Sequence, residues 1–171
     1  KDARESFANT IAGADLIVGA RSGSVQLLLY SVFRIGNPVA NILWKSHQDL
    51  ASDPRVAWTI PMSLGDSHRG FRVLGTSTSY FEHYRYADGR ALVVAEGKAF
   101  DDLYDVVLGS AVAAELGYRL GDRIIVQHGL GTGIAKEHDD RPFTVAGILA
   151  PTGTPVDRTL HVSLEGIEAM H

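Results

Sequence analysis

The chain has 171 residues, of which 45% are hydrophobic and 21% are charged, the balance of an ordinary globular protein with a packed core. Its 16 Lys and Arg against 20 Asp and Glu give a formal net charge of −4. A nucleic-acid partner and an acidic membrane surface are disfavoured, because both depend on clustered Lys and Arg. The chain has no cysteine, which excludes disulfides, thiolate chemistry and cysteine-based zinc sites.

The first part of the chain predicts a short strand and then one long apolar stretch. Residues 14–19 (ADLIVG) are apolar apart from Asp15 and are bounded by glycines, a pattern typical of a short buried strand. Residues 25–33 (VQLLLYSVF) are far fewer than the roughly 20 apolar residues that span a bilayer. This stretch is either core or an exposed patch for a partner subunit or the membrane. Its candidate interface residues are Leu27, Leu28, Leu29, Val32 and Phe33.

A helix and a hairpin are expected next. Asn41 can cap a helix over residues 42–52, and Pro54 ends it because the residue before a proline avoids helical geometry. The hairpin is expected to have strands at residues 56–62 and 70–75, with a turn at residues 65–68 between them.

The middle of the chain predicts a strand–helix–strand unit. Residues 105–109 (DVVLG) are typical of a strand, and Ser110 can cap a helix through Leu116. Gly117 stands where a helix often ends in a left-handed residue. A second strand is expected over residues 123–128. The connection is shorter than a parallel crossover needs, and the relative direction of the two strands stays open.

The last part predicts a polar loop, two strands and a helix that begins at Ser163. The loop covers residues 129–141 and the first strand residues 143–149. A turn at residues 151–155 then leads to the second strand at residues 158–162. One face of the first strand is expected to carry Phe143, Val145 and Leu149. Together these elements predict a mixed α+β fold with more strand than helix.

Four segments, taken in order, resemble the periplasmic core domain of MacB-like and FtsX-like ABC transporter permeases. They are residues 13–21, residues 72–77 followed by Tyr80 and Phe81, residues 107–113 leading to 120–124, and residues 143–154 continuing to 161–164. No single segment is specific, but their order and spacing extend over nearly the whole chain. The resemblance implies a domain inserted between the first and second transmembrane helices of a permease.

The resemblance also implies two lobes. Residues 1–77 would form the first half of a membrane-proximal βαβ lobe, and residues 78–171 a distal β-rich lobe with the start of the returning segment. The chain departs from the family pattern at its end, where the returning half of the proximal lobe is absent or only begun at Ser163. The sheet of the proximal lobe is therefore expected to be incomplete.

The function that the resemblance implies is mechanical and non-catalytic. The domain would lie on the periplasmic face of the bacterial inner membrane and relay ATP-driven movement of membrane helices to a substrate or partner outside. The implied partners are a separate ATPase subunit, reached through the membrane part, and a second permease copy or a periplasmic partner protein. No cofactor is expected.

The residues most suited to metal or phosphate chemistry lack the required context. Three glycines after a strand suggest a phosphate-binding turn, but no helix follows and no lysine is placed for it, so a plain flexible loop is expected. These are Gly129, Gly131 and Gly133. A zinc hypothesis would use His128, His138, Asp139, Asp140 and His161. Their spacing matches no zinc motif, and surface or hydrogen-bonded histidines are expected instead.

Nucleophilic catalysis has equally little support. The chain has no Gly-x-Ser-x-Gly elbow, and the neighbours Ser67 and His68 need not be partners in a triad. Asp101 and Asp102 precede a strand and are expected to cap or solvate a turn. No catalytic, cofactor-binding or metal-binding residue is therefore assigned. The alternatives are an extracytoplasmic ligand-sensing domain or, with less support, a small metal-dependent hydrolase.

Overall fold

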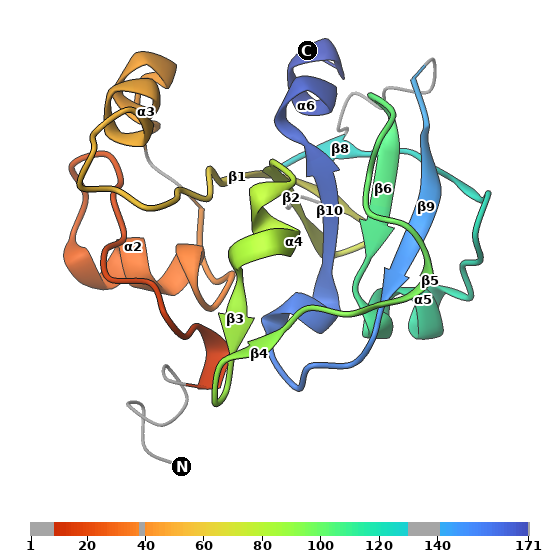
Figure 1. Ribbon diagram of the computed structural model, residues 1–171. Helices are drawn as coiled ribbons and strands as arrows, with labels where there is room; N and C mark the ends of the chain where they lie inside the picture. Colours follow the sequence, from red (N-terminus) through yellow and green to blue (C-terminus); the bar gives the residue numbers. More distant parts are fainter. Residues whose placement is uncertain (1–8, 38–39, 130–140, 171) are drawn as a thin grey trace.

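A mixed, curled β-sheet with helices around it organises the computed structural model, which describes residues 9–37, 40–129 and 141–170 (Figure 1). From one edge to the other the sheet contains β5 (Val94–Gly97), β9 (Phe143–Leu149), β6 (Asp105–Leu108), β10 (Thr159–Ser163), β2 (Phe71–Thr76), β1 (Ser63–His68) and β8 (Gln127–His128). Strands β6 and β9 are parallel, as are β2 and β10, and the remaining neighbours are antiparallel. This confirms the α+β class with a strand-rich sheet.

One short stretch of chain connects the two edges of the sheet. Strand β7 (Arg123–Ile124) pairs with β9 near one edge, and β8 pairs with β1 at the other. Only residues 125 and 126 separate β7 from β8, so the sheet must curl for both pairings to form. The single strand predicted over residues 123–128 is thus two strands with different partners. Because β7 runs antiparallel to β9 and β6 runs parallel to it, β6 and β7 run in opposite directions.

Alternating side chains divide the interior into two clusters, one on each face of the sheet. On β6, Val106 and Leu108 pack in the first cluster and Val107 in the second, as the two-residue period of a strand requires. The first cluster also receives Val112 of α5 (Ser110–Leu116) and Met170 of α6 (Leu164–Met170). The second cluster is centred on Tyr80 of α4 (Ser79–His83).

A bulge in β9 places Leu149 on the other face of the sheet from the one that the sequence predicts. Val106 pairs with Val145, but Val107 pairs with Gly147, so Ala146 is an extra residue. An inserted residue reverses the alternation beyond it. Phe143 and Val145 therefore share the first cluster as expected, whereas Leu149 packs in the second.

The hairpin of β1 and β2 turns later than predicted. Residues 65–68 belong to β1, and the turn consists of Arg69 and Gly70, with φ of 46° and 83°. Two consecutive residues with positive φ form the kind of two-residue turn whose twist matches that of antiparallel strands. The predicted start of the helix capped by Asn41 was also wrong, since α3 (Trp44–Ala51) has Leu43 as its N-cap residue. The N-cap of α5 is Gly109 rather than Ser110, while Gly117 has the expected left-handed conformation, with φ 70°.

The residues before β1 form a layer beside the sheet rather than part of it (Figure 1). This N-terminal layer, residues 9–62 without 38–39, contains α2 (Ser24–Ser31) and α3. The strands predicted at residues 14–19 and 56–62 are absent, because neither stretch lies beside a strand that could complete a hydrogen-bonded ladder. The layer is attached through a bridge between Ala12 and Arg85 of β3 (Arg85–Tyr86), which pairs with β4 (Arg90–Ala91).

Nothing in this arrangement tests the predicted boundary between lobes at residue 77, which stays a prediction. Within the described ranges, no helix is both long enough and apolar enough to cross a bilayer.

Candidate functional site

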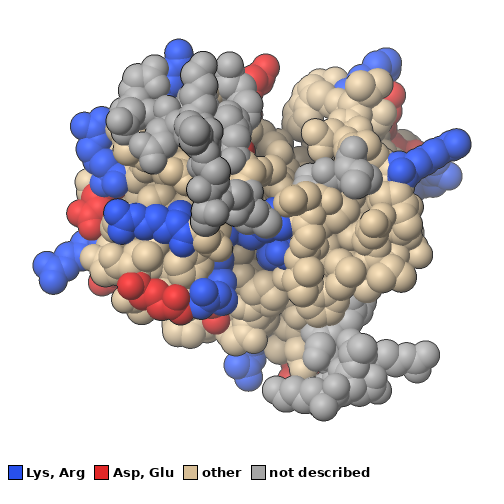
Figure 2. All heavy atoms as spheres, turned by 180° about the vertical axis from the view of Figure 1, so that it is seen from behind, with Lys and Arg blue, Asp and Glu red and all other residues tan. Residues whose placement is uncertain are grey.

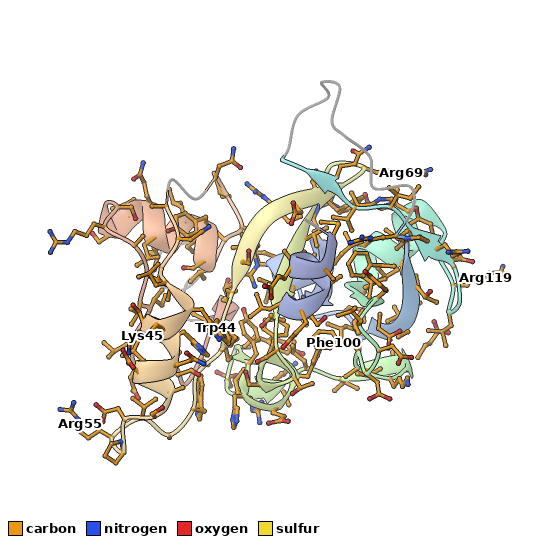
Figure 3. All side chains as sticks on the ribbon, turned by 90° about the horizontal axis from the view of Figure 1, so that it is seen from above. Trp44, Lys45, Arg55, Arg69, Phe100 and Arg119 are labelled. Carbon is orange, nitrogen blue, oxygen red and sulfur yellow. The ribbon has the colours of Figure 1, made fainter. Side chains whose placement is uncertain are left out.

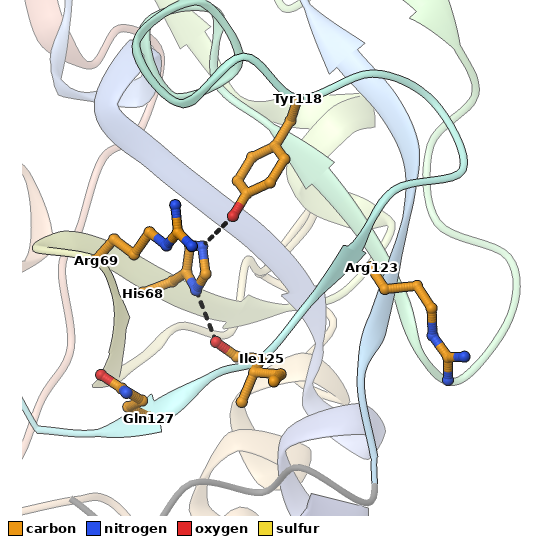
Figure 4. A pocket seen from close by; sticks show the side chains of 6 residues that line it. All are labelled: His68, Arg69, Tyr118, Arg123, Ile125 and Gln127. Atoms are coloured by element: carbon orange, nitrogen blue, oxygen red, sulfur yellow. Dashed lines mark hydrogen bonds between the residues drawn. The ribbon is translucent and has the colours of Figure 1, made fainter.

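A small hollow of about 170 Å³ lies beside His68, at the end of β1 (Figure 4). The Nδ1 of His68 is 2.7 Å from the carbonyl oxygen of Ile125, which can only accept, so Nδ1 carries the proton. Nε2 then accepts from the Tyr118 hydroxyl at 2.8 Å. Burial lowers the pKa of His68; the hydrogen bond to Ile125 offsets part of this, and the charge of Arg69 adds a smaller lowering. Both ring nitrogens are used, which makes His68 a clamp between the hairpin and the chain that crosses to β8.

Ser67 has a related structural role. Its hydroxyl donates to the carbonyl oxygen of Gly129, immediately after β8. Ser67 and His68 thus bind the same crossing segment from two adjacent positions of β1, and the hydroxyl and the imidazole do not bond to each other. This arrangement contains no serine nucleophile with its base.

The residues of the zinc hypothesis are not brought together in the part of the chain that the structure describes. His161 is fully buried in β10, where Nδ1–H donates to the Val107 carbonyl at 3.0 Å and Nε2 accepts from the Tyr80 hydroxyl at 3.2 Å. His128 is placed only through its backbone, which pairs with Asp66. The other three members, His138, Asp139 and Asp140, lie outside the described residues. No cluster of three or more His, Cys, Asp or Glu suited to a metal occurs in the described ranges.

The remaining sequence candidates have ordinary structural roles where they are described. The backbone N–H groups of Asp101 and Asp102 both donate to the carboxylate of Asp105, at 3.0 and 2.9 Å. This is the turn before β6 that the sequence predicts. Of the three loop glycines, Gly129 ends the crossing segment with φ 73°, and Gly131 and Gly133 lie outside the described residues.

The apolar stretch at residues 25–33 forms α2 and the turn after it, and its two faces differ. Val32 is 2% exposed and belongs to the core, whereas Leu29 keeps 37% of its surface exposed. Leu27, Leu28 and Phe33 are half-buried. The core interpretation therefore applies to Val32, immediately after the helix, whereas α2 itself has no buried residue. Its assignment as a partner interface stays a prediction.

A wider apolar surface surrounds that helix in the N-terminal layer. Of the twelve large hydrophobic side chains exposed in the described part of the chain, nine lie between residues 16 and 50. We call these nine residues the apolar surface: Leu16, Val18, Val25, Leu29, Ile35, Ile42, Leu43, Trp44 and Leu50. Monomeric domains rarely expose so many apolar side chains in one region without a binding partner. In the back view the middle of this layer is largely free of charged side chains, which gather at its upper outer edge (Figure 2).

Sequence reasoning found only part of the apolar surface. Leu16 and Val18 were expected in a buried strand, but they are 83% and 54% exposed. Trp44, which no sequence pattern marks, is 55% exposed on the side of α3 that faces the rest of the molecule, opposite Lys45 (Figure 3).

Comparison with known families identifies the chain over most of its length. The family model described as MacB-like periplasmic core domain matches residues 2–170, nearly the whole chain. No curated protein matches the sequence. On this match the chain belongs to the MacB-like periplasmic core domain family, the extracytoplasmic domain of ABC transporter permeases.

Proposed function

We propose that this domain is a mechanical element that couples movement of membrane helices to a partner or substrate outside the membrane. The observation that carries the proposal is the apolar surface. It belongs to a layer that is joined to a well-packed sheet, yet α2 and α3 contain no buried residue. A surface of this kind suits an interface that forms and separates between two arrangements of the permease.

The partner on the apolar surface would be protein. Burying a neutral, largely apolar face against another such face is favourable, because it removes apolar surface from water. The few charges on this face give a phosphate-rich surface little to bind. We propose a second copy of the permease as the first partner, with a periplasmic partner protein as the other occupant. The ATPase that drives the movement is a separate chain or domain, as the family implies.

A catalytic function receives no support from the described residues. The two histidines that best fit such a role, His68 and His161, each use both ring nitrogens within the protein. A general base needs a free nitrogen within reach of its substrate. The proposal therefore assigns the domain no reaction of its own.

Site-specific crosslinking in the full-length permease tests the proposed interface. Because this chain has no cysteine, Leu43→Cys adds a unique thiol to the domain, on the apolar surface. In a permease otherwise free of cysteine, this variant should form a disulfide-linked dimer in membranes, and ATP should change its yield. Arg119→Cys is the matched control, because Arg119 is exposed on the opposite side of the molecule (Figure 3). Equal crosslinking of both variants, or no crosslinking of Leu43→Cys to any protein, would refute the proposal.

A further inference from the structure

A second hollow, of about 610 Å³, lies between the N-terminal layer and the sheet. Three segments border it: the turn after α2, the β1–β2 hairpin, and the short 3₁₀ helix Pro155–Arg158 with the turn that leads into it. Each segment contributes one arginine, namely Arg34, Arg72 and Arg158. The back view shows basic side chains in the furrow between the two parts of the molecule (Figure 2).

Arg72 is a buried cation without a carboxylate partner among the described residues. Its residue is 7% exposed, and its guanidinium donates to the Asn37 side-chain oxygen at 3.2 Å and to the Gly36 carbonyl. Burial lowers the pKa of Arg72, because a charge is less stable away from water. Neutral oxygens stabilise such a charge less than a carboxylate or phosphate does.

Arg34 is buried to the same degree. It is 8% exposed, has φ 60°, and donates to the Ser31 carbonyl. Its Nε is buried and has no hydrogen-bond partner in the described part of the chain. Burial raises the pKa of Tyr80, and Arg34 offsets part of this rise through its charge and a side-chain hydrogen bond to the Tyr80 hydroxyl. No described carboxylate lies within salt-bridge distance of either Arg34 or Arg72.

Arg158 differs from the other two because it is already paired. It forms a salt bridge with Glu115 at 2.5 Å and lies over the Phe71 ring, 4.7 Å from its centroid. The carboxylate of Asp157, in the same turn, accepts from Thr152 and from the backbone of Gly153. These acidic groups near the hollow are therefore engaged elsewhere, and the two buried arginines keep a net positive charge there.

We infer that this hollow binds an oxyanion, a carboxylate or phosphate group, between Arg34 and Arg72. Removing an unpaired charge from water is costly, and an anion held by hydrogen bonds compensates that cost. The planar guanidinium groups offer donors in the geometry that oxyanions accept. The site lies between the layer that bears the apolar surface and the sheet, so an anion bound there would also hold those two parts together.

Anion titration of the isolated domain tests the inference without any mutation. Inorganic phosphate, malonate and chloride are compared at constant ionic strength, with the arginine Nε–H resonances followed by NMR. Phosphate, malonate or both should shift the Arg34 and Arg72 resonances saturably and raise the melting temperature, whereas chloride should do neither. A response to phosphate alone assigns a phosphate ligand, and a response to malonate assigns a carboxylate. Absence of a saturable shift with both oxyanions would overturn the inference.

Two variants connect the response to the site. Arg34→Gln should remove the saturable shift and the rise in melting temperature, while Arg119→Gln, at an exposed arginine on the other side of the molecule, should retain both. Circular dichroism checks that Arg34→Gln is folded, and if it is not, the titration of the unmodified chain still decides. An undiminished response in folded Arg34→Gln would contradict the assignment. Because the readout is anion binding rather than crosslinking, failure here leaves the proposed mechanical function standing.

Discussion

His161 is the buried ionisable side chain at the centre of the fold. It lies on the face of β10 opposite Leu160 and Val162, so it projects from the sheet toward α4. The Tyr80 ring packs against it with centroids 5.0 Å apart. The pKa of His161 is lowered to about 3, chiefly by burial; the hydrogen bond to Val107 opposes this in part, and the nearby charge of Arg34 adds a smaller lowering. The imidazole is therefore neutral in the native protein over most of the pH range.

This neutral histidine predicts a defined loss of stability in acid. In the unfolded chain the pKa of histidine is about 6.5, so the unfolded state binds a proton between about pH 6.5 and 3 that the native state does not. The free energy of unfolding should then fall as the pH falls through this window, by up to about 1.4 kcal/mol per pH unit from this residue. Urea unfolding between pH 7 and 4 should show a shallower slope in His161→Gln than in the unmodified chain.

Tyr80→Phe is the control for that experiment. Removing the hydroxyl leaves Nε2 of His161 without its donor and should cost about 1–3 kcal/mol at all pH values. Because the imidazole remains buried, the pH slope should persist. If His161→Gln kept the full slope, the proton uptake would belong to other groups and the prediction would be wrong.

At the scale of elements, β5 and β9 can approach each other closely because residue 147 of β9 is a glycine and has no side chain. Gly147 pairs with Gly97, next to the bulge at Ala146. A Cβ at Gly147 would lie 2.1 Å from the backbone oxygen of Lys98. Backbone atoms cannot turn away as the end of a flexible side chain can, so the strand β5 would have to move.

Gly147→Ala should therefore destabilise the domain by about 2 kcal/mol or more, as overpacking at a site that cannot relax does. Gly65→Ala is the matched control, because Gly65 lies in β1 and a Cβ added there would meet no atom within 4 Å. Its effect should stay within about 0.5 kcal/mol. Thermal unfolding of the two variants measures the difference, and similar melting temperatures would contradict the packing argument.

At the scale of the whole molecule, the distribution of exposed apolar side chains is uneven. The sheet and its helices enclose two well-packed clusters, whereas the N-terminal layer exposes the apolar surface. Proteins bury such surfaces against partners. When the partner is missing, the exposed surfaces of two copies associate with each other. The isolated chain is therefore expected to self-associate through this layer.

Light scattering at increasing concentration tests this expectation. The double variant Leu43→Ser/Trp44→Ser should shift the chain toward monomer, because it removes two of the largest exposed groups, which are 75% and 55% exposed. Val93→Ser, at a residue 57% exposed outside the apolar surface, should leave the association unchanged. A monomer at all concentrations in the unmodified chain would mean that the layer closes on itself.

What the sequence by itself determined was local. The unit from β6 through α5 to Gly117, the strand β9, and β10 with its helix α6 were all expected close to their observed bounds. Each has its own signal, an apolar alternation or a glycine placed at an end, and needs no distant residue to be recognised. The order of family motifs also placed the chain correctly, because it depends on sequence alone.

What only the tertiary structure decided was the set of distant partners. Residues 14–19 have a strand pattern but no neighbouring strand, and residues 123–128 divide because their two halves pair with β9 and β1. The sequence also placed Arg34 and Arg72 far apart, although the fold brings both to one hollow without a described carboxylate to pair with them. A strand forms only where another segment completes its hydrogen bonds. Whether a charged side chain has an opposite charge beside it depends on which residues surround it in the fold. Both depend on contacts between residues far apart in the chain, and folding alone creates those contacts.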